Sequence, residues 1–474
     1  MNTLASDSRP AKSGDELPLP FLAALLCAAA LLLAFGEFHF SRVSVLILVG
    51  LPLIGLMLFS FDMMVLVFVA SLFTTQDFFL FKLAVPMAIP LVLAFAATHA
   101  DVRPWDFRTG ATGPLILYLM TMLPSLVNSP DPGLTLAYML NYIMFGAAVL
   151  VLAASLKTFN EIARPLRFFA TLTVVNALIV IALGVSSGTR VFGLPGIVYV
   201  DFAPIVILTL LTYFIFTPGW KRIAAAGLMI LVLVSLVMGQ TRNTLITLGV
   251  ATAIFSGYLV KNHRLTGHSR RTMVVSIVIL VVTCGAAIGF AWVAAPGAFA
   301  RLAHIGQQTD YEINQTTDFA LNSLMTRILI WMTAWQAFLA HPVAGVGAFS
   351  FPFASRLYST LPPDLFLLYV KGVGPHITYL ALLAETGILG FAGFLFLLVK
   401  SLGIAVQSMR ISVLPGERTL SACLLAAQLY VSLSMFATDA WLWGQCGMLW
   451  AVLLGSSLAN RRMLQLRYAA PANA

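Results

Sequence analysis

The sequence predicts an all-α membrane protein, a polytopic bundle of helices that crosses the bilayer many times. Hydrophobic residues make up 60% of the 474 residues, and charged residues make up only 9%. Apolar runs long enough to cross a bilayer recur from one end of the chain to the other. These runs are too evenly spread to leave room for separate soluble domains, so one continuous helical bundle is expected.

The apolar runs predict about fourteen spans, or about twelve if two short early runs do not cross the membrane. They fall near residues 20–36, 42–59, 62–76, 83–100, 112–128, 136–155, 166–184, 203–217, 222–239, 243–260, 273–295, 376–400, 419–436 and 442–459. No small-x-small cleavage site follows the polar start, so the first run is expected to remain as an uncleaved span. All four cysteines lie inside apolar runs, which predicts neither a disulfide framework nor a cysteine metal site.

The distribution of basic residues predicts the orientation. Alternating connections place most of the 27 Lys and Arg residues, and both chain ends, on one side, and the positive-inside rule makes that side cytoplasmic. The net charge of +9 is therefore mainly a topology signal and does not indicate nucleic-acid binding. The cations left on the opposite side need another explanation. They are Arg42, Lys82, Arg190, Arg242, Arg301, Arg327, Arg356 and Lys371.

One long connection dominates the predicted organisation. The parts are a cytoplasmic tail at 1–19, an N-terminal transmembrane bundle at 20–295, a large extracytoplasmic loop at 296–375, C-terminal transmembrane helices at 376–459 and a cytoplasmic tail at 460–474. Long loops between strong spans are usually functional, so the chemistry is expected in this loop. Apolar residues recur every three or four positions in Ser323–Ala340, which predicts an amphipathic helix in which Arg327 is an embedded charge.

Two turns of the loop carry candidate groups. At His341-Pro342, the proline ends a helix, and Gly345 and Gly347 then allow a tight backbone path, although Gly-x-Gly alone is a weak phosphate signal. The loop closes at His376, where the next span begins and where an imidazole is suited to act as a general base toward an acceptor hydroxyl.

The span that follows His376 contains further unusual residues. Glu385 lies about two and a half turns further on, where a lone carboxylate is costly unless it is paired or faces a cavity. Gly387 and Gly390 would let another helix approach closely.

Two of the extracytoplasmic arginines are candidates for binding phosphate. Arg190 lies in a glycine-containing loop at 184–201, and Arg242 lies at the outer start of a span. Guanidinium groups suit bidentate binding of phosphate oxygens, and several of them would stabilise a departing lipid pyrophosphate.

These residues resemble the O-antigen ligase and O-antigen polymerase superfamily of bacterial envelope enzymes. The resemblance rests on Arg327 with Trp331, on His341-Pro342-x-x-Gly345-x-Gly347-x-x-x-Phe351, and on His376 with Ala384-Glu385-Thr386-Gly387-x-x-Gly390. The large late loop and the Thr241-Arg242 span start support it, and together they cover most of residues 185–400.

The resemblance implies a glycosyltransferase of the bacterial inner membrane with its active site facing the periplasm. Its substrates would be an undecaprenyl-pyrophosphate-linked glycan and an acceptor glycan or glycolipid, and it would need no metal, nucleotide sugar or other cofactor. In this interpretation His376 is catalytic, and Arg190 and Arg242 hold the pyrophosphate. The family often has Asn or Ser after this histidine, and Ile377 departs from that pattern. Arg327, His341, Glu385, Gly387 and Gly390 are candidate supporting residues.

Several activities fit this chemistry equally well. A ligase joins the glycan to the lipid A core, a polymerase joins it to another lipid-linked repeat, and a protein O-oligosaccharyltransferase joins it to a protein hydroxyl. A secondary transporter or lipid flippase is a reading of a different class. It is disfavoured because ionisable residues are sparse in the predicted spans and no paired broken helices mark inverted repeats.

Overall fold

The computed structural model describes residues 60–468, except for 75–76, 79–80, 100–108, 188–190, 192, 194–197, 240, 267–268, 295–322 and 443. Several predicted features lie outside the described residues. They are the tail at 1–19, the first two predicted spans, Arg190, the first part of the loop at 296–375 and the end of the C-terminal tail.

The described chain is all-helical apart from two short antiparallel strands, β1 (Asp77–Phe78) and β2 (Phe81–Lys82). The helices before the predicted loop are α3 (Phe61–Ser71), α4 (Ala88–Thr98), α5 (Thr112–Met122), η3 (Leu123–Asn128), α6 (Pro132–Ser155), α7 (Phe159–Ser187), α8 (Tyr199–Phe216), α9 (Trp220–Met238), α10 (Arg242–Lys261), η5 (His263–Thr266) and α11 (Arg270–Ala294). The later helices are α13 (Ser323–Ala340), α14 (Phe351–Tyr358), α15 (Pro363–Tyr369), α16 (Thr378–Ile411), α17 (Pro415–Ser434), η6 (Ala440–Leu442) and α18 (Gly444–Tyr468).

The predicted multi-pass helical fold is confirmed, but fewer helices reach spanning length than there are predicted runs. Within the described residues, α6, most of α7, α8, α9, α10 and α16 are long and apolar enough to cross a membrane. Other predicted runs form shorter helices, among them α3 and α4 with 11 residues each. An 11-residue helix is about 16 Å long, roughly half the thickness of the hydrocarbon core.

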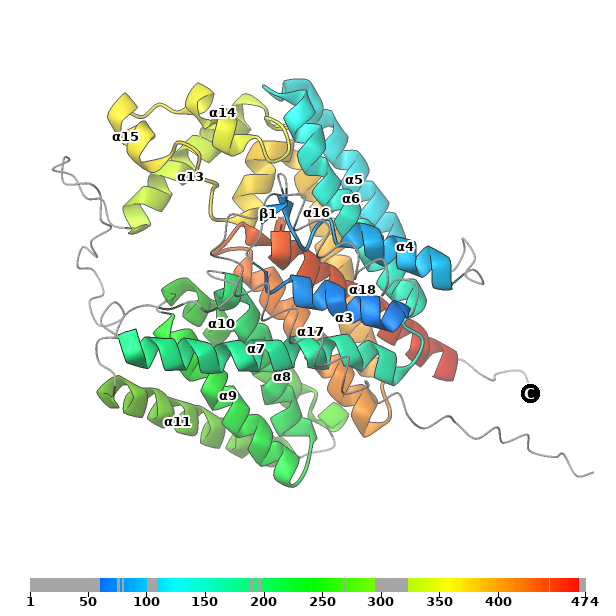
Figure 1. Ribbon diagram of the computed structural model, residues 1–474. Helices are drawn as coiled ribbons and strands as arrows, with labels where there is room; N and C mark the ends of the chain where they lie inside the picture. The colour runs from blue at the N-terminus through cyan, green and yellow to red at the C-terminus, as the bar shows by residue number, and fades with distance from the viewer. Residues whose placement is uncertain are drawn as a thin grey trace, which may run out of the picture. The chain divides into compact units, whose positions relative to one another are not determined.

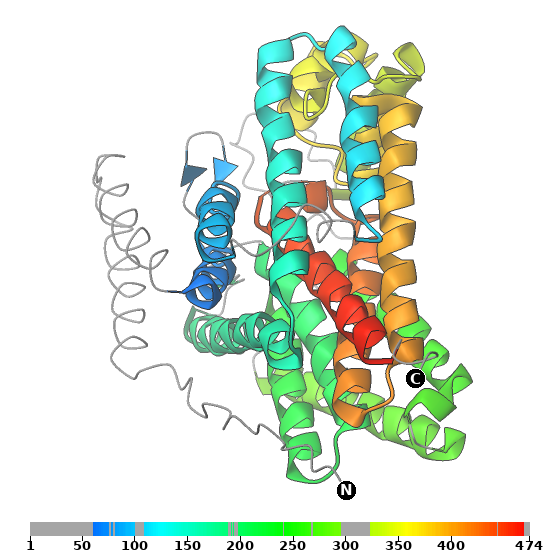
Figure 2. The ribbon, with the colours of Figure 1, turned by 90° about the vertical axis from the view of Figure 1, so that its right-hand side faces the viewer.

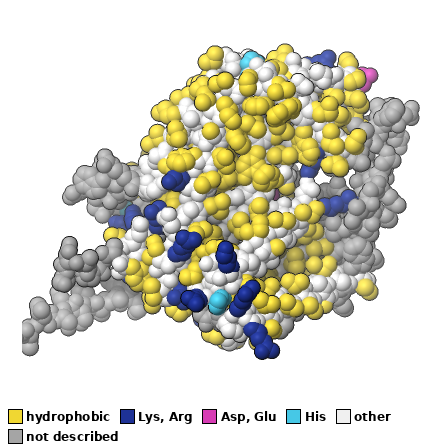
Figure 3. Space-filling model, turned by 180° about the vertical axis from the view of Figure 1, so that it is seen from behind, with side chains coloured by type: hydrophobic (Ala, Val, Ile, Leu, Met, Phe, Trp, Pro, Cys, Tyr) yellow, Lys and Arg dark blue, Asp and Glu magenta, His cyan; other side chains and the backbone are white. Residues whose placement is uncertain are grey.

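The described helices form two packed groups. In the first, α5 packs against α16, and α18 packs against both α6 and α16 (Figures 1 and 2). In the second, α9 contacts α7, α8 and α11, and α17 joins the two groups by packing on α8 and α16. Hydrophobic side chains cover much of the face shown in Figure 3, while Lys and Arg gather toward its lower part. This separation is typical of a membrane protein, in which charged side chains lie outside the apolar belt.

The predicted span at 376–400 is not one continuous helix. Gly387 has φ 62° and ψ −167°, which interrupts α16 between residues 378–386 and 388–411. The ring centroid of Tyr379 lies 6.4 Å from those of both Phe391 and Phe394. These residues would be roughly 18 Å or more apart along a continuous helix. The two segments therefore fold back on each other as a helical hairpin.

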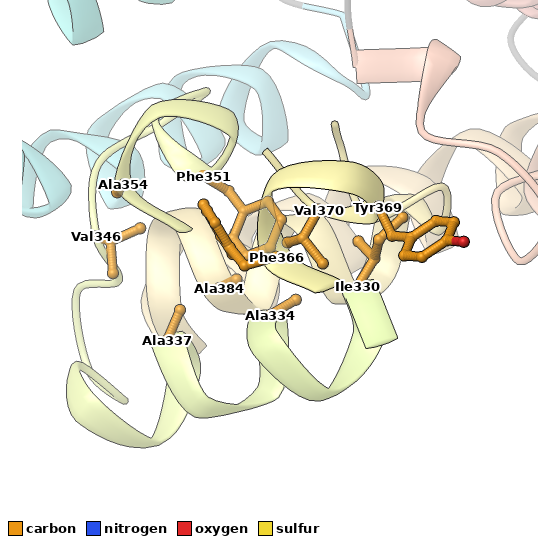
Figure 4. Close-up of a cluster of buried hydrophobic side chains, with 10 residues drawn as sticks. All are labelled: Ile330, Ala334, Ala337, Val346, Phe351, Ala354, Phe366, Tyr369, Val370 and Ala384. Carbon is orange, nitrogen blue, oxygen red and sulfur yellow. The ribbon is translucent and has the colours of Figure 1, made fainter. Parts of the chain in front are cut away.

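Helices α13, α14 and α15 form a small subdomain with its own core, and α13 has the bounds that the sequence predicts. Figure 4 shows this core, in which Phe351 and Phe366 lie among small side chains from α13 and α16. Alanines at 334, 337 and 384 let α13 approach the first segment of α16. The α13–α15 subdomain is thus fixed to the hairpin that follows His376.

Candidate active site

The segment after α13 crosses the interruption of α16 through paired backbones. The N–H groups of Val346 and Gly347 donate to the carbonyls of residues 384 and 385, at 3.0 and 2.9 Å. In return, the N–H of Ile388 donates to the carbonyl of Pro342 at 2.9 Å. These bonds satisfy backbone groups that the break in the helix would otherwise leave unpaired. The first predicted turn is thus a docked part of the hairpin.

Two glycines make this crossing feasible. Gly345 and Gly387 both have positive φ, 70° and 62°. A Cβ at Gly345 would strike the backbone of Glu385, and a Cβ at Gly387 would strike the backbone of Val343. The sequence predicts that another helix approaches Gly387 and Gly390. Instead, the loop after α13 approaches Gly387, and Gly390 lies against Thr386 of the same hairpin.

Glu385 is a buried structural acceptor. Its side chain is 3% exposed, and its carboxylate accepts the backbone N–H groups of Phe349 at 2.9 Å and Phe351 at 3.4 Å. The second bond reaches the first residue of α14, whose N–H has no partner within its own helix. These contacts explain how the bundle accommodates a lone carboxylate.

The same loop is fastened to η3 and α6. Asn128 donates to the carbonyl of Gly345 at 3.1 Å, and the hydroxyl of Ser125 accepts the N–H of residue 348 at 3.1 Å. The hydroxyls of Ser350 and Thr135 lie 2.7 Å apart. Three polar contacts from distant parts of the sequence thus hold the segment between α13 and α14.

At the other end of the first α16 segment, His376 meets Asp439. The imidazole Nδ1 lies 3.8 Å from Asp439 Oδ1, and the backbone N–H of His376 donates to Oδ2 at 3.1 Å. The His376 side chain is 42% exposed, whereas that of Asp439 is 15% exposed. The structure thus sets an exposed imidazole against a shielded carboxylate.

The electrostatics of Asp439 agree with this pairing. Burial would raise the pKa of its carboxyl, but contacts with the imidazole and backbone N–H of His376 outweigh burial and leave the pKa below its ordinary value. Asp439 therefore stays ionised beside His376.

The backbone around His376 is held from two sides. Thr378, the first residue of α16, donates its N–H to the carbonyls of Met435 and Thr438, and its hydroxyl donates to Thr438 at 2.6 Å. On the α13 side, the indole N–H of Trp331 donates to the carbonyl of Pro375 at 2.9 Å. His376 itself has φ 57°, an uncommon conformation that these contacts must stabilise.

The start of α10 contacts α13 through Arg327. Arg242 begins α10, and the amide oxygen of the next residue, Asn243, accepts hydrogen bonds from the guanidinium of Arg327 when the amide is oriented to satisfy both groups. Arg327 precedes Trp331 by four residues and so lies on the same face of α13, about 6 Å along the axis. Through Trp331, that face contacts the backbone next to His376.

The predicted residues fall in two places. Trp331, on the same face of α13 as Arg327, bonds the backbone beside His376, and Arg327 contacts Asn243 next to Arg242. Glu385, Gly387 and His341 lie around the loop crossing, where His341 contacts the ring of Tyr358. In the described part of the chain, no three His, Cys, Asp or Glu side chains gather in a metal-binding arrangement.

The sequence reasoning missed Asp439. Its signal is an acidic residue between two predicted apolar spans, at 419–436 and 442–459. Nothing in the local sequence connects this residue to His376, which lies 63 positions earlier.

Comparison with known proteins finds a family similarity over part of the chain. None of the curated proteins matches the chain. A family model described as "Wzy_C: O-Antigen ligase" matches residues 227–395, from within α9 to the second segment of α16, a range that includes Arg242, Arg327 and His376 but not Asp439. Residues 227–395 of this multi-pass membrane protein are therefore similar to the O-antigen ligase family, as the motifs in that range predict.

Proposed function

We propose that the protein transfers a glycan from undecaprenyl pyrophosphate to a hydroxyl of the lipid A core at the periplasmic face of the inner membrane. The pairing of His376 with Asp439 carries this proposal. It supplies a base that is open to a substrate hydroxyl and a carboxylate that orients this base. On the α13 side, Trp331 bonds the backbone beside His376 and lies on the same helix face as Arg327.

The reaction is a single displacement. His376 accepts the proton of the acceptor hydroxyl while the oxygen forms a bond to the anomeric carbon of the donor. The bond between that carbon and the pyrophosphate breaks, and its electron pair leaves with undecaprenyl pyrophosphate. Attack from the side opposite the leaving group inverts the anomeric carbon. Asp439 stabilises the imidazolium that forms.

Arg242 and Arg327 act on the leaving group. Guanidinium groups bind phosphate oxygens through paired hydrogen bonds and offset the charge that develops on the pyrophosphate. The contact between Asn243 and Arg327 places this second arginine beside the start of α10, which supports a binding role for a residue whose sequence context left its function open. Arg190 remains a sequence-based candidate for the same task.

The test is glycan transfer by the purified full chain in nanodiscs. Undecaprenyl-pyrophosphate-linked oligosaccharide is supplied with lipid A core, a second lipid-linked repeat or an unfolded protein as acceptor. We expect a product on the lipid A core. A product on the lipid-linked repeat alone would replace the ligase assignment with a polymerase, and a product on protein alone would indicate an O-oligosaccharyltransferase. Folded protein that transfers to none of the three contradicts the proposal.

A further inference from the structure

The proposed reaction leaves one strained residue without a role. Phe349 has φ 59°, a left-handed backbone that bulky side chains rarely adopt. Glu385 accepts its N–H, Ser125 accepts the N–H of the preceding residue, and Ser350, the following residue, bonds Thr135. Contacts from α16, η3 and α6 thus fix a conformation that the local sequence does not favour. Strain maintained in this way is typical of functional sites.

The result of this strain is an aromatic pair. The ring of Phe349 lies against that of Tyr138 of α6, with centroids 4.2 Å apart and planes tilted by 32°. Both side chains are partly exposed. Tyr138 lies one turn after Thr135, on the face of α6 that meets the loop. The two rings therefore form one aromatic surface at the junction of the loop with α6.

This surface lies near the proposed reacting centre but not in it. The Phe349 N–H is bound to Glu385, close to the end of the α16 segment at 378–386, and His376 precedes the other end of that segment. A segment of this length is about 13 Å long. A glycan with its anomeric carbon at His376 would reach the aromatic pair after a few sugar units.

We infer that Phe349 and Tyr138 form a carbohydrate-binding platform that stacks on a sugar ring of a bound glycan, a few units from the reacting anomeric carbon. The inference rests on the proposed function. Aromatic faces pack well against the C–H faces of pyranose rings, whose hydroxyls remain in water. Apolar packing between loop and helix would require neither an aromatic ring nor a left-handed backbone. The donor glycan and the acceptor glycan offer the same chemistry, and kinetics separates them.

The experiment compares the wild type with Phe349→Leu, which keeps an apolar side chain but lacks an aromatic face. Transfer is measured in nanodiscs with undecaprenyl-pyrophosphate-linked oligosaccharide as donor and lipid A core as acceptor. We expect the KM for one glycan substrate to rise about two- to tenfold while kcat is retained. A rise for the donor places the donor glycan on the platform, and a rise for the acceptor places the acceptor glycan there.

Matched variants exclude indirect effects. Phe349→Trp should keep the wild-type KM. Tyr138→Leu removes the other ring of the pair and should raise the KM as Phe349→Leu does. It replaces Phe349→Leu in the experiment if that variant does not fold. Phe353→Leu is the control, because Phe353 is an aromatic residue of α14 that is 58% exposed and lies four positions further on. It should leave both KM values unchanged. Inhibition by glycan-free undecaprenyl pyrophosphate should be the same for the wild type and Phe349→Leu.

Two outcomes overturn the platform. One is a folded Phe349→Leu variant with the wild-type KM for both substrates. The other is a Phe349→Leu variant in which inhibition by glycan-free undecaprenyl pyrophosphate is weakened by the same factor as the KM rises. Calorimetric binding of the oligosaccharide-linked carrier separates this failure from failure of the proposed function. If the wild type shows no turnover but its binding depends on Phe349, the transferase is rejected and the platform is retained.

Discussion

The two ends of the short α16 segment at 378–386 each carry a carboxylate contact, but the contacts differ in what they hold. At one end, the carboxylate of Asp439 faces an imidazole that is 42% exposed. At the other end, the carboxylate of Glu385 is buried and bonds two backbone N–H groups. Under the proposed function, Asp439 therefore acts on the chemistry through His376, whereas Glu385 fixes the loop between α13 and α14.

The largest expected effect is on catalysis at the His376 end. His376→Asn removes the base, and Asn tolerates the left-handed backbone at this position. We expect the transfer rate to fall by about 10²- to 10⁴-fold, with only a small fall in the melting temperature from the lost contact with Asp439. Initial rates and thermal denaturation of the purified variant measure both. A variant that keeps the wild-type rate would remove the catalytic half of the comparison.

The next effect should be on stability at the Glu385 end. Glu385→Ala leaves two N–H groups without their acceptor, which should lower the free energy of unfolding by about 2–6 kcal/mol. Glu385→Gln keeps an amide oxygen as acceptor and should cost less and retain transfer. A well-folded Glu385→Gln variant without activity would show that this carboxylate also takes part in the chemistry.

A third change tests the loop crossing between the two ends. Gly387 has φ 62°, and Gly387→Ala introduces a Cβ that would strike the backbone of Val343. We expect a loss of at least about 2 kcal/mol of stability, since the backbone strain adds to the clash. Gly403→Ala in the same helix is the control, because a Cβ there meets nothing within 4 Å. Equal stability of the two variants would argue against the hairpin.

The smallest effect concerns pH. Because the pKa of Asp439 is lowered in the folded protein, its carboxylate contributes stability above the unfolded pKa of about 4, and this contribution is lost as the pH falls through the folded pKa. Asp439→Asn lacks this contribution at every pH. The difference in Tm between the wild type and Asp439→Asn should therefore shrink as the pH falls from about 5 to about 2. A constant difference would mean that His376 does not stabilise the carboxylate.

The sequence by itself determined the multi-pass helical class, the α13 helix and the family motifs. Apolar runs and residue spacing are local properties, and the membrane allows few structures other than helices for such runs. The sequence also indicated His376 and Arg242 as candidates, since a polar group at the end of an apolar span needs a reason.

Only the tertiary structure decided how these residues combine. The contact of Asp439 with His376, the bond of Trp331 to Pro375 and the placement of Arg327 beside Asn243 join residues that are far apart in sequence. The fold-back at Gly387 was equally hidden, because a glycine within an apolar run is compatible with a continuous helix. Its left-handed backbone is selected by the loop that docks there, and that contact exists only once α13 and α16 have packed together.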